Sequence, residues 1–288
     1  MCGIAGYIGK KNFLPVERKK LFDLMNNRGP DSKGYKLIQN KKNSIHFFFS
    51  RLAIIAPNKN SNQPYTYKDK TLIFNGEIYN YLELKNKLKK SGYHFITDSD
   101  TEVLIKALDK WGINCVNKLE GMWSFFFHDG KKKTSYLCRD RFGEKPLFFL
   151  KNLDELYFGS EIKFIRYLFN KKLEVNFKKI ENFLKFGYKS IYKNNNTYYK
   201  NIKSVPAGTF LKIKENNIEQ INYWKIKSEI IDVDKTKYFK DLKEKLFRSI
   251  ELRLRSDFPI AFHLSGGIDS NAIAFIAKKY FNYNLKTF

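Results

Sequence analysis

The stretch MCGIAGYIG (Met1–Gly9) places a cysteine directly before a short apolar strand. Ile4–Ile8 is a run of small and apolar residues, and Gly9 is expected to close it. An initiator methionine is normally removed when the next residue is small, so Cys2 is expected to become the N-terminal residue. A terminal cysteine combines a thiol nucleophile with its own α-amine, whose pKa near ~8 suits it to accept the thiol proton. The opening therefore predicts a strand that carries a nucleophile at its start.

Beyond this strand, the first half of the chain reads as many short strands with a few helices between them. A helix is expected from Pro15, and apolar spacing predicts two more, one near Tyr81–Leu88 and one near Val103–Trp111. Runs rich in β-branched and aromatic residues predict strands, among them Ile45–Ile55, Thr71–Asn75, Met122–His128, Thr134–Arg139, Lys145–Lys151, Glu155–Gly159, Thr209–Ile213 and Ile218–Tyr223. Because helices and strands do not alternate regularly, an α+β layered domain is expected.

The character changes toward the C-terminus. After a helix with a predicted apolar stripe (Phe239, Leu242, Leu246, Ile250 and Leu254), Pro259–Leu264 predicts a strand, Asp269–Tyr280 a helix and Asn284–Phe288 another strand. This βαβ order is typical of an α/β parallel-sheet nucleotide-binding domain. We therefore expect one domain over residues 1–215 and a second over 225–288. One βαβ unit cannot cover both faces of a parallel sheet, so the second domain is expected to be incomplete.

The bulk composition excludes several classes of protein. No apolar run approaches the ~18 residues that span a bilayer, and the N-terminus lacks the features of a signal peptide, so a cytoplasmic location is expected. Three cysteines without metal-ligand spacing predict neither a disulfide framework nor a zinc site. The net charge of +25 could attract nucleic acid. Most of this charge is lysine scattered through every segment, and no nucleic-acid-binding module is recognisable, so nucleic acid is not the expected partner.

Several motifs follow Cys2 in a fixed order. MCGIAG resembles the N-terminus of class II glutamine amidotransferases, and the resemblance continues through RGPD (28–31), SRLAI (50–54), NGEIYN (75–80) and SDTE (99–102). LEGMWSF (119–125), RDRFGEKPL (139–147) and GSEIK (159–163) resemble the asparagine synthase branch of that family. The resemblance implies a four-layer αββα sandwich of the N-terminal nucleophile hydrolase type, followed by the start of the parallel-sheet domain.

The resemblance also implies residue roles. Cys2 would attack the glutamine amide, and the Asn75 side chain with the Gly76 N–H would receive the developing oxyanion. Arg51 would hold the glutamine α-carboxylate, because a guanidinium meets a carboxylate with two parallel hydrogen bonds. Asp100 would hold the α-ammonium. The implied glutamine site is Arg51, Leu52, Asn75, Gly76, Glu77 and Asp100.

Each of these motifs also has a purely structural interpretation. Asn75-Gly76 alone indicates a hairpin turn, and Ser99 with Glu102 indicates a helix capping box. Arg51 within a strand could be a solvated edge charge. Their order and spacing behind Cys2 favour the catalytic interpretation.

A second motif lies in the predicted βαβ unit. Leu264-Ser265-Gly266-Gly267-Ile268-Asp269-Ser270 follows a strand and opens a helix, where glycine N–H groups and the helix N-terminus favour an anion. The motif resembles the pyrophosphate loop of ATP-pyrophosphatases. The implied ATP-binding residues are Leu264, Ser265, Gly266, Gly267, Asp269 and Ser270.

Together the two motifs imply glutamine-dependent, ATP-dependent amidation of aspartate to asparagine. The resemblance implies ATP and Mg²⁺ for the synthetase step, no cofactor for glutamine hydrolysis, and glutamine, ATP and aspartate as partners; it leaves a homodimer open. Two alternatives remain: an amidotransferase acting on another carboxylate, for instance a sugar acid of a surface polysaccharide, and an inactive scaffold or basic RNA-binding protein.

Overall fold

The structure is a computed structural model that describes residues 1–40, 43–188, 194–226, 228 and 234–288. These residues form two compact units, one of Met1–Ala53 with Asn58–Lys225 and the other of Ile54–Pro57 with Ile226–Phe288. The expected domain limit at position 215 falls in the turn of a β-hairpin, and the first unit continues to Lys225. Residues 189–193 of the expected first domain and residues 227 and 229–233 of the expected second domain lie outside the described residues.

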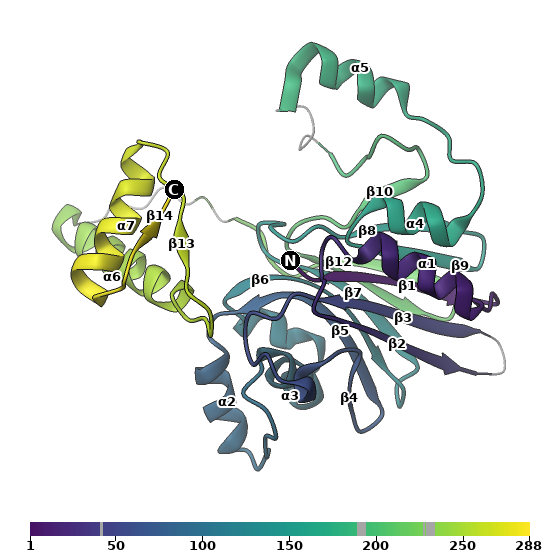
Figure 1. Cartoon of the computed structure of the whole chain (residues 1–288), viewed down its shortest axis with the longest axis horizontal. Coiled ribbons are helices and arrows are strands. Elements are labelled where there is room, and N and C mark those ends of the chain that lie inside the picture. The colour runs from purple at the N-terminus through teal and green to yellow at the C-terminus, as the bar shows by residue number, and fades with distance from the viewer. Residues whose placement is uncertain (41–42, 189–193, 227, 229–233) are drawn as a thin grey trace. The chain divides into compact units, whose positions relative to one another are not determined.

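The described part of the first unit contains two antiparallel sheets (Figure 1). In spatial order, the strands of the first sheet are β10 (Ile202–Ser204), β8 (Phe148–Asn152), β9 (Glu155–Gly159), β1 (Gly3–Gly9), β3 (Ser44–Arg51) and β2 (Ser32–Gln39). The strands of the second sheet are β12 (Asn217–Asn222), β11 (Thr209–Lys214), β7 (Thr134–Arg139), β6 (Gly121–Asp129), β5 (Lys70–Ile78) and β4 (Tyr65–Tyr67).

The central strands are apolar on both faces because both faces are buried. Along β3, Phe47 and Phe49 point into the core between the two sheets, while Phe48 packs under the helices on the outer side. Phe126 of the second sheet meets Phe158 of the first with ring centroids 4.3 Å apart, in a tilted arrangement. Aromatic contact of this kind adds to area burial in fixing how the sheets stack.

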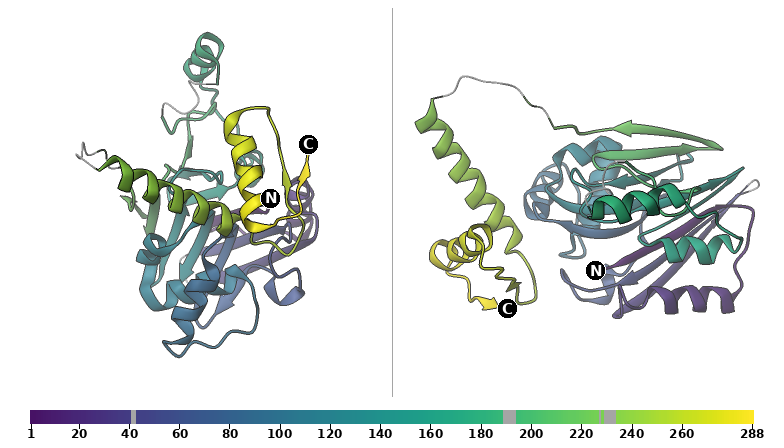
Figure 2. Two further views of the ribbon diagram at one scale, coloured as in Figure 1. Left: turned by 90° about the vertical axis from the view of Figure 1, so that its left-hand side faces the viewer. Right: turned by 90° about the horizontal axis from the view of Figure 1, so that it is seen from above.

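Helices cover the outer face of each sheet. On the first sheet lie α1 (Pro15–Met25) and α4 (Ile162–Phe169), and on the second lie α2 (Tyr81–Lys89), α3 (Asp100–Trp111) and the 3₁₀ segment η2 (Gly112–Lys118). Figure 2 shows the same layers from two further directions. The expected four-layer αββα sandwich is confirmed. The remaining elements of this unit are the 3₁₀ segment η1 (Lys59–Ser61) and α5 (Phe177–Phe186).

The second unit contains α6 (Lys235–Arg253), β13 (Ala261–Phe262), α7 (Ile268–Phe281) and β14 (Lys286–Thr287). β13 and β14 pair in parallel on either side of α7, as the βαβ pattern predicts. On α6, Ile250 is buried, but Phe239, Leu242 and Leu246 are exposed. The predicted helix is confirmed, and its apolar stripe is exposed at Phe239, Leu242 and Leu246 in the described unit.

Other local predictions also need correction. The strand expected to reach Ile55 ends at Arg51. The strand expected from Lys145 begins at Phe148, because the Lys145 N–H is engaged by the carboxylate of Asp140 at 2.9 Å. None of the described helices is long and apolar enough to cross a bilayer.

Candidate active site

Cys2 lies immediately before β1, beside the end of β3. The strands pair with Gly3 opposite Ser50, so Cys2 and Arg51 take the next positions on neighbouring strands. The Cys2 thiol donates to the Leu52 carbonyl and the Leu52 N–H donates to Cys2 Sγ, both over 3.4 Å. The Cys2 carbonyl accepts a hydrogen bond of 2.9 Å from Arg28 Nε. Contacts on both the side chain and the backbone therefore fix the position of the sulfur.

The surroundings of Cys2 keep its thiol protonated at rest. Burial raises the pKa of the thiol, and the charge of Asp100 raises it further. The Leu52 N–H, the chain's amino terminus and Arg51 oppose this increase. A neutral thiol is a weak nucleophile, so reaction at Cys2 requires a base that removes its proton.

Arg51 ends β3 with its side chain almost fully buried. Its Nη1 donates to the Asn58 carbonyl and to Asn62 Oδ1, each over 2.8 Å. Burial lowers the pKa of the guanidinium, while the charges of Cys2, Asp100 and Asp31 raise it. Arg51 is thus a buried cation held in place by backbone and amide oxygens, in the same electrostatic environment as Cys2.

Asn75, Gly76 and Glu77 lie inside β5, so the hairpin interpretation of Asn75-Gly76 is wrong. Asn75 pairs with Ser124 and Gly76 with Trp123 of β6. Asn75 is 1% exposed, and its Nδ2 lies 3.5 Å from Ser124 Oγ. A Cβ on Gly76 would stand 2.2 Å from the Met122 carbonyl oxygen, which no side chain can do without moving the strand. The closeness of β5 and β6 therefore explains the glycine.

Asp100 occupies the first turn of α3, directly after the N-cap Ser99. One carboxylate oxygen accepts a hydrogen bond of 3.0 Å from the Ile78 N–H at the end of β5. Burial raises the pKa of Asp100 to about 7, and the nearby charge of Glu77 contributes to the increase. Ser99 caps the helix through Thr101, whereas Glu102 accepts from Ile96 and Thr97 rather than from the cap residue.

The structure gathers these groups at one place in the first unit. The charges of Arg51 and Asp100 shift the pKa of the Cys2 thiol, and the charge of Glu77 shifts that of Asp100. The charge of the chain's amino terminus in turn shifts the pKa of Glu77. Cys2 and Arg51 come from the first sheet, whereas Asn75, Gly76 and Glu77 come from the second. The site thus forms where matching ends of the two stacked sheets meet.

Sequence reasoning gave no role to two cations that flank Cys2. Arg28 bonds to the Cys2 carbonyl, and its Nη1 lies 3.2 Å from Glu161 Oε1. Lys145 is buried with its Nζ 3.3 Å from the Met1 sulfur. Both residues stand in motifs quoted above. The sequence shows that each motif contains a cation, but only the fold shows that Arg28 and Lys145 lie beside Cys2.

The second predicted site is the loop before α7. Gly266 has φ +80°, and Gly267 precedes the first residue of the helix. The Ser265 and Ser270 hydroxyls lie 3.2 Å apart, and the Ser265 N–H donates to Ser270 Oγ. Leu264 bonds through its N–H to the Phe288 carbonyl, and Asp269 stands in the first turn of α7. Hydroxyls and backbone N–H groups at a helix N-terminus suit a phosphate group. Within the described residues, no group of three or more His, Cys, Asp or Glu side chains could hold a metal ion.

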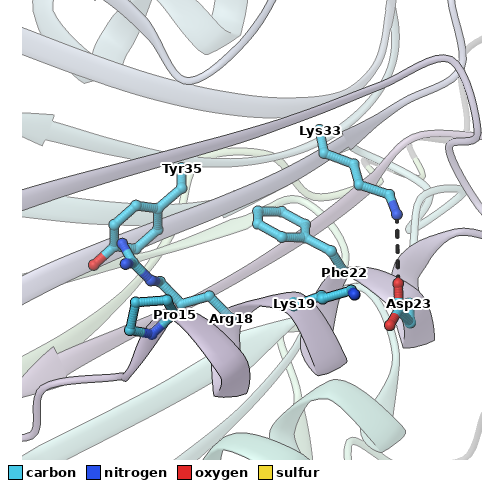
Figure 3. A pocket seen from close by; sticks show the side chains of 7 residues that line it. All are labelled: Pro15, Arg18, Lys19, Phe22, Asp23, Lys33 and Tyr35. Atoms are coloured by element: carbon cyan, nitrogen blue, oxygen red, sulfur yellow. Dashed lines mark ion pairs between the residues drawn. The ribbon is translucent and has the colours of Figure 1, made fainter.

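A separate pocket of about 320 Å³ opens between α1 and β2 (Figure 3). Its polar side chains engage one another, since Lys33 Nζ lies 3.6 Å from Asp23 Oδ1 and the Arg18 guanidinium stacks on Tyr35. None of the predicted catalytic or substrate-binding residues is among the residues that line it. The pocket is therefore distinct from the site at Cys2.

Comparison with known proteins agrees with the two-part organisation. A family model described as a glutamine amidotransferase domain matches residues 1–224, and one described as asparagine synthase matches residues 241–288. The chain is 34% identical to asparagine synthetase [glutamine-hydrolyzing] 1 of Bacillus subtilis (strain 168), over 100% of this chain and 45% of the relative. It is 32% identical to putative asparagine synthetase [glutamine-hydrolyzing] 2 of Methanocaldococcus jannaschii, over 97% of this chain and 57% of the relative. The chain thus spans about half the length of these curated relatives.

A more distant relative carries a different name, since amidase chry2 of Gibberella zeae is 27% identical over 95% of this chain and 42% of its own length. Among solved structures, the B. subtilis glutamine phosphoribosylpyrophosphate amidotransferase complexed with ADP and GMP has a TM-score of 0.57 at 14% identity, covering 99% of this chain and 65% of that one. This likeness supports the fold alone. Because the glutamine amidotransferase model matches residues 1–224, the chain belongs to the glutamine amidotransferase family.

Proposed function

We propose that the first unit hydrolyses glutamine to glutamate and ammonia, with Cys2 as the nucleophile. The observation that carries this proposal is the gathering of a positioned cysteine, a buried guanidinium and a buried carboxylate around the start of β1. A free amino acid offers one carboxylate and one ammonium, so a selective pocket needs one cation and one anion. Arg51 and Asp100 supply these charges.

The chemistry proceeds by acyl transfer to sulfur. With Met1 removed, the α-amine of Cys2 accepts the thiol proton while the sulfur attacks the side-chain amide carbon of glutamine. Asn75 Nδ2 and the Gly76 N–H receive the oxyanion. The α-amine then passes the proton to the leaving nitrogen, the C–N bond breaks, and ammonia leaves as the thioester forms. Water then hydrolyses the thioester to release glutamate. Preorganised donors of this kind contribute roughly 3–4 kcal/mol each.

The contacts of substrate-binding residues support their assignment. Arg51 presents a planar fork for the α-carboxylate, and Leu52 positions the Cys2 sulfur through its backbone. Glu77 is partly buried near the chain's amino terminus, and burial raises its pKa. We assign Glu77 together with Asp100 to the α-ammonium of glutamine.

For the second unit, we propose that the loop Leu264–Ser270 binds the phosphates of ATP. Its hydroxyls, glycine N–H groups and helix N-terminus fit a pyrophosphate group. ATP would supply the adenylyl group that activates the acceptor carboxylate, with pyrophosphate as the leaving group. Mg²⁺ would enter with the nucleotide, and Asp269 is the acidic side chain of the loop. In this proposal the ammonia amidates aspartate to asparagine, by analogy with the names of the curated relatives.

The acceptor is the less constrained part of this proposal. A second candidate keeps the same two-part organisation and amidates a different carboxylate; the similarity to a relative named amidase chry2 shows that related chains do not all carry the asparagine synthetase name. The three free cysteines suit a reducing compartment, which supports placing the reaction in the cytoplasm.

The test is glutamate release from glutamine by the purified chain, measured beside two matched variants. Cys2→Ala should abolish release, whereas Cys115→Ala should retain it, because the Cys115 thiol is fully buried in the core. Retention of release in Cys2→Ala, or no release from a folded wild-type chain, would refute the proposal.

A further inference from the structure

Lys145 is a buried cation whose side chain lies beside Met1 and has no role in the mechanism proposed above. Its side chain is 6% exposed. Among the described residues, the sulfur of Met1 is the one hydrogen-bond acceptor of its Nζ, at 3.3 Å. A buried ammonium with such a weak partner is costly. Removal of Met1 takes this partner away and leaves Lys145 facing the new terminus.

The backbone of Lys145 is held rigidly by Asp140, which is fully buried between β7 and β8. The Asp140 carboxylate accepts hydrogen bonds from the N–H groups of Phe142, Glu144, Lys145 and Trp123, over 2.9–3.2 Å. The Asp140 carbonyl accepts another from Gly208 at 2.8 Å. A carboxylate with so many charge-assisted bonds fixes the loop, so the position of the lysine is set by the fold.

The ammonium of Lys145 interacts electrostatically with the Met1 amine and with the Cys2 side chain, the two groups on either side of the Cys2 nitrogen. Lys145 and Arg28 both lower the pKa of the amine on Met1, beyond the larger effect of burial. The charge of Cys2 in turn raises the pKa of Lys145, against the lowering effect of burial. Along the covalent chain, the nitrogen of Cys2 stands between the Met1 amine and the Cys2 side chain. It is therefore exposed to the same cation.

Other charges also face this nitrogen and determine the net effect. Three cations contribute: Arg28 before β2, Arg51 at the end of β3 and Lys145 before β8. Five anions contribute, and they are Asp31 before β2, Glu77 on β5, Asp100 on α3, Glu144 before β8 and Glu161 before α4. Glu161 is paired with Arg28, and the Asp31 carboxylate accepts from the Ala53 N–H over 2.7 Å. Lys145 has no such anionic contact within ion-pair distance in the described structure, although the charges of Glu77 and Glu144 raise the pKa of its ammonium from farther away.

We propose that Lys145 is a positioning residue that keeps the α-amine of the mature Cys2 uncharged near neutral pH, ready to accept the thiol proton. The inference rests on the proposed glutaminase function and extends it. A nearby like charge disfavours a second ammonium. The same cation favours the thiolate that forms when the proton moves from sulfur to nitrogen.

The direct test measures the amine itself. The chain without Met1, verified by intact mass, is labelled with [¹³C]cysteine, and the Cα shift of Cys2 is followed by NMR from pH 5 to 10. Cys115 and Cys138 are internal references, because both are fully buried and burial raises the pKa of each thiol. Lys145→Met should raise the amine midpoint by about one pH unit, whereas Lys145→Arg should leave it within a few tenths. The buried lysine of α5 offers a matched control, and Lys179→Met should leave the midpoint unchanged.

Kinetics provide the second measurement. An amine with a raised pKa is protonated over more of the neutral range, so the acidic limb of kcat/KM for glutamine should move to higher pH by the same amount in Lys145→Met. A purely structural role would lower activity equally at every pH. An unchanged amine midpoint in Lys145→Met overturns the inference even if glutamine is hydrolysed. Absence of hydrolysis by the wild-type chain overturns the proposed function instead, and the NMR titration still decides the role of Lys145.

Discussion

The carboxylate of Asp100 accepts a hydrogen bond from the backbone N–H of Ile78 over 3.0 Å. This bond ties the first turn of α3 to the last residue of β5, two residues beyond Gly76. The group proposed to hold the substrate ammonium is thereby coupled to the strand that carries the proposed oxyanion donors. Displacement of either element changes the distance between the two ends of a bound glutamine.

Glutamine affinity is expected to depend on the protonation of Asp100. Burial raises the pKa of this carboxyl to about 7 in the free protein, and an ammonium binds only its ionised form. The dissociation constant of glutamine should therefore rise about tenfold per pH unit below pH 7. Calorimetric titration of the Cys2→Ala variant between pH 5 and 9 measures this slope. Asp100→Asn should bind weakly and without the slope; a flat profile in the Cys2→Ala background would contradict the assignment.

The same residue predicts a trade-off between stability and binding. Because the folded pKa is raised above the unfolded value, the contribution of Asp100 to stability is greatest below the unfolded pKa and is lost as pH rises through about 7. Asp100→Asn, which stays neutral and can still accept from Ile78, should raise the melting temperature at pH 8.5 by at least about 3 °C and leave it nearly unchanged at pH 4. Scanning calorimetry at both pH values checks this. Destabilisation at pH 8.5 would show that burial is not the dominant influence on Asp100.

Asn75→Ala should impair the chemical step more than substrate binding. Loss of one oxyanion donor typically lowers kcat by about 10²–10³-fold, and the buried side chain makes only a long contact of 3.5 Å with Ser124. Ser124→Ala is the matched control, because it removes that contact and leaves the amide in place. Steady-state glutamate release measures kcat and KM for both variants. Equal losses of kcat in the two variants would argue against a donor role for Asn75.

Arg28 is expected to matter through the backbone of Cys2. Its Nε holds the Cys2 carbonyl at 2.9 Å, so Arg28→Met should misplace the nucleophile and lower kcat/KM for glutamine by about 100-fold. Arg18→Met, on α1, removes a stacking contact with Tyr35 and should leave hydrolysis unchanged. A crystal structure of Arg28→Met with Cys2 undisplaced, together with full activity, would exclude this role.

Much of the first unit was predictable because its strands are apolar on both faces. Phe47, Phe48 and Phe49 form a continuous apolar run, which is the signature of a strand buried on two sides, and the structure places it between helices and the second sheet. β2 gave no such signal, since SKGYKLIQ is polar and lies at the edge of its sheet. The apolar periodicity of α6 predicted a helix correctly, but it did not indicate that Phe239, Leu242 and Leu246 are exposed in the described unit.

The candidate site was predictable where a motif carried it and not where tertiary contacts carry it. Asn75-Gly76 has the local signature of a turn, but pairing with Ser124 and Trp123 keeps it extended. Local sequence preference is overridden here by the ladder of β5 and β6. The proximity of Lys145 to Cys2 depends on contacts across more than 140 positions of the chain, which no periodicity encodes.

The origin of the site in two different sheets has a practical consequence. Cys2 and Arg51 are fixed to one sheet and Asn75 and Gly76 to the other, and aromatic packing such as that of Phe126 on Phe158 sets the alignment between them. A small slip of one sheet over the other would separate nucleophile from oxyanion donors while leaving every strand hydrogen-bonded. Catalytic turnover is thus a more sensitive gauge of interior order than circular dichroism, and heat inactivation should precede the loss of β-structure.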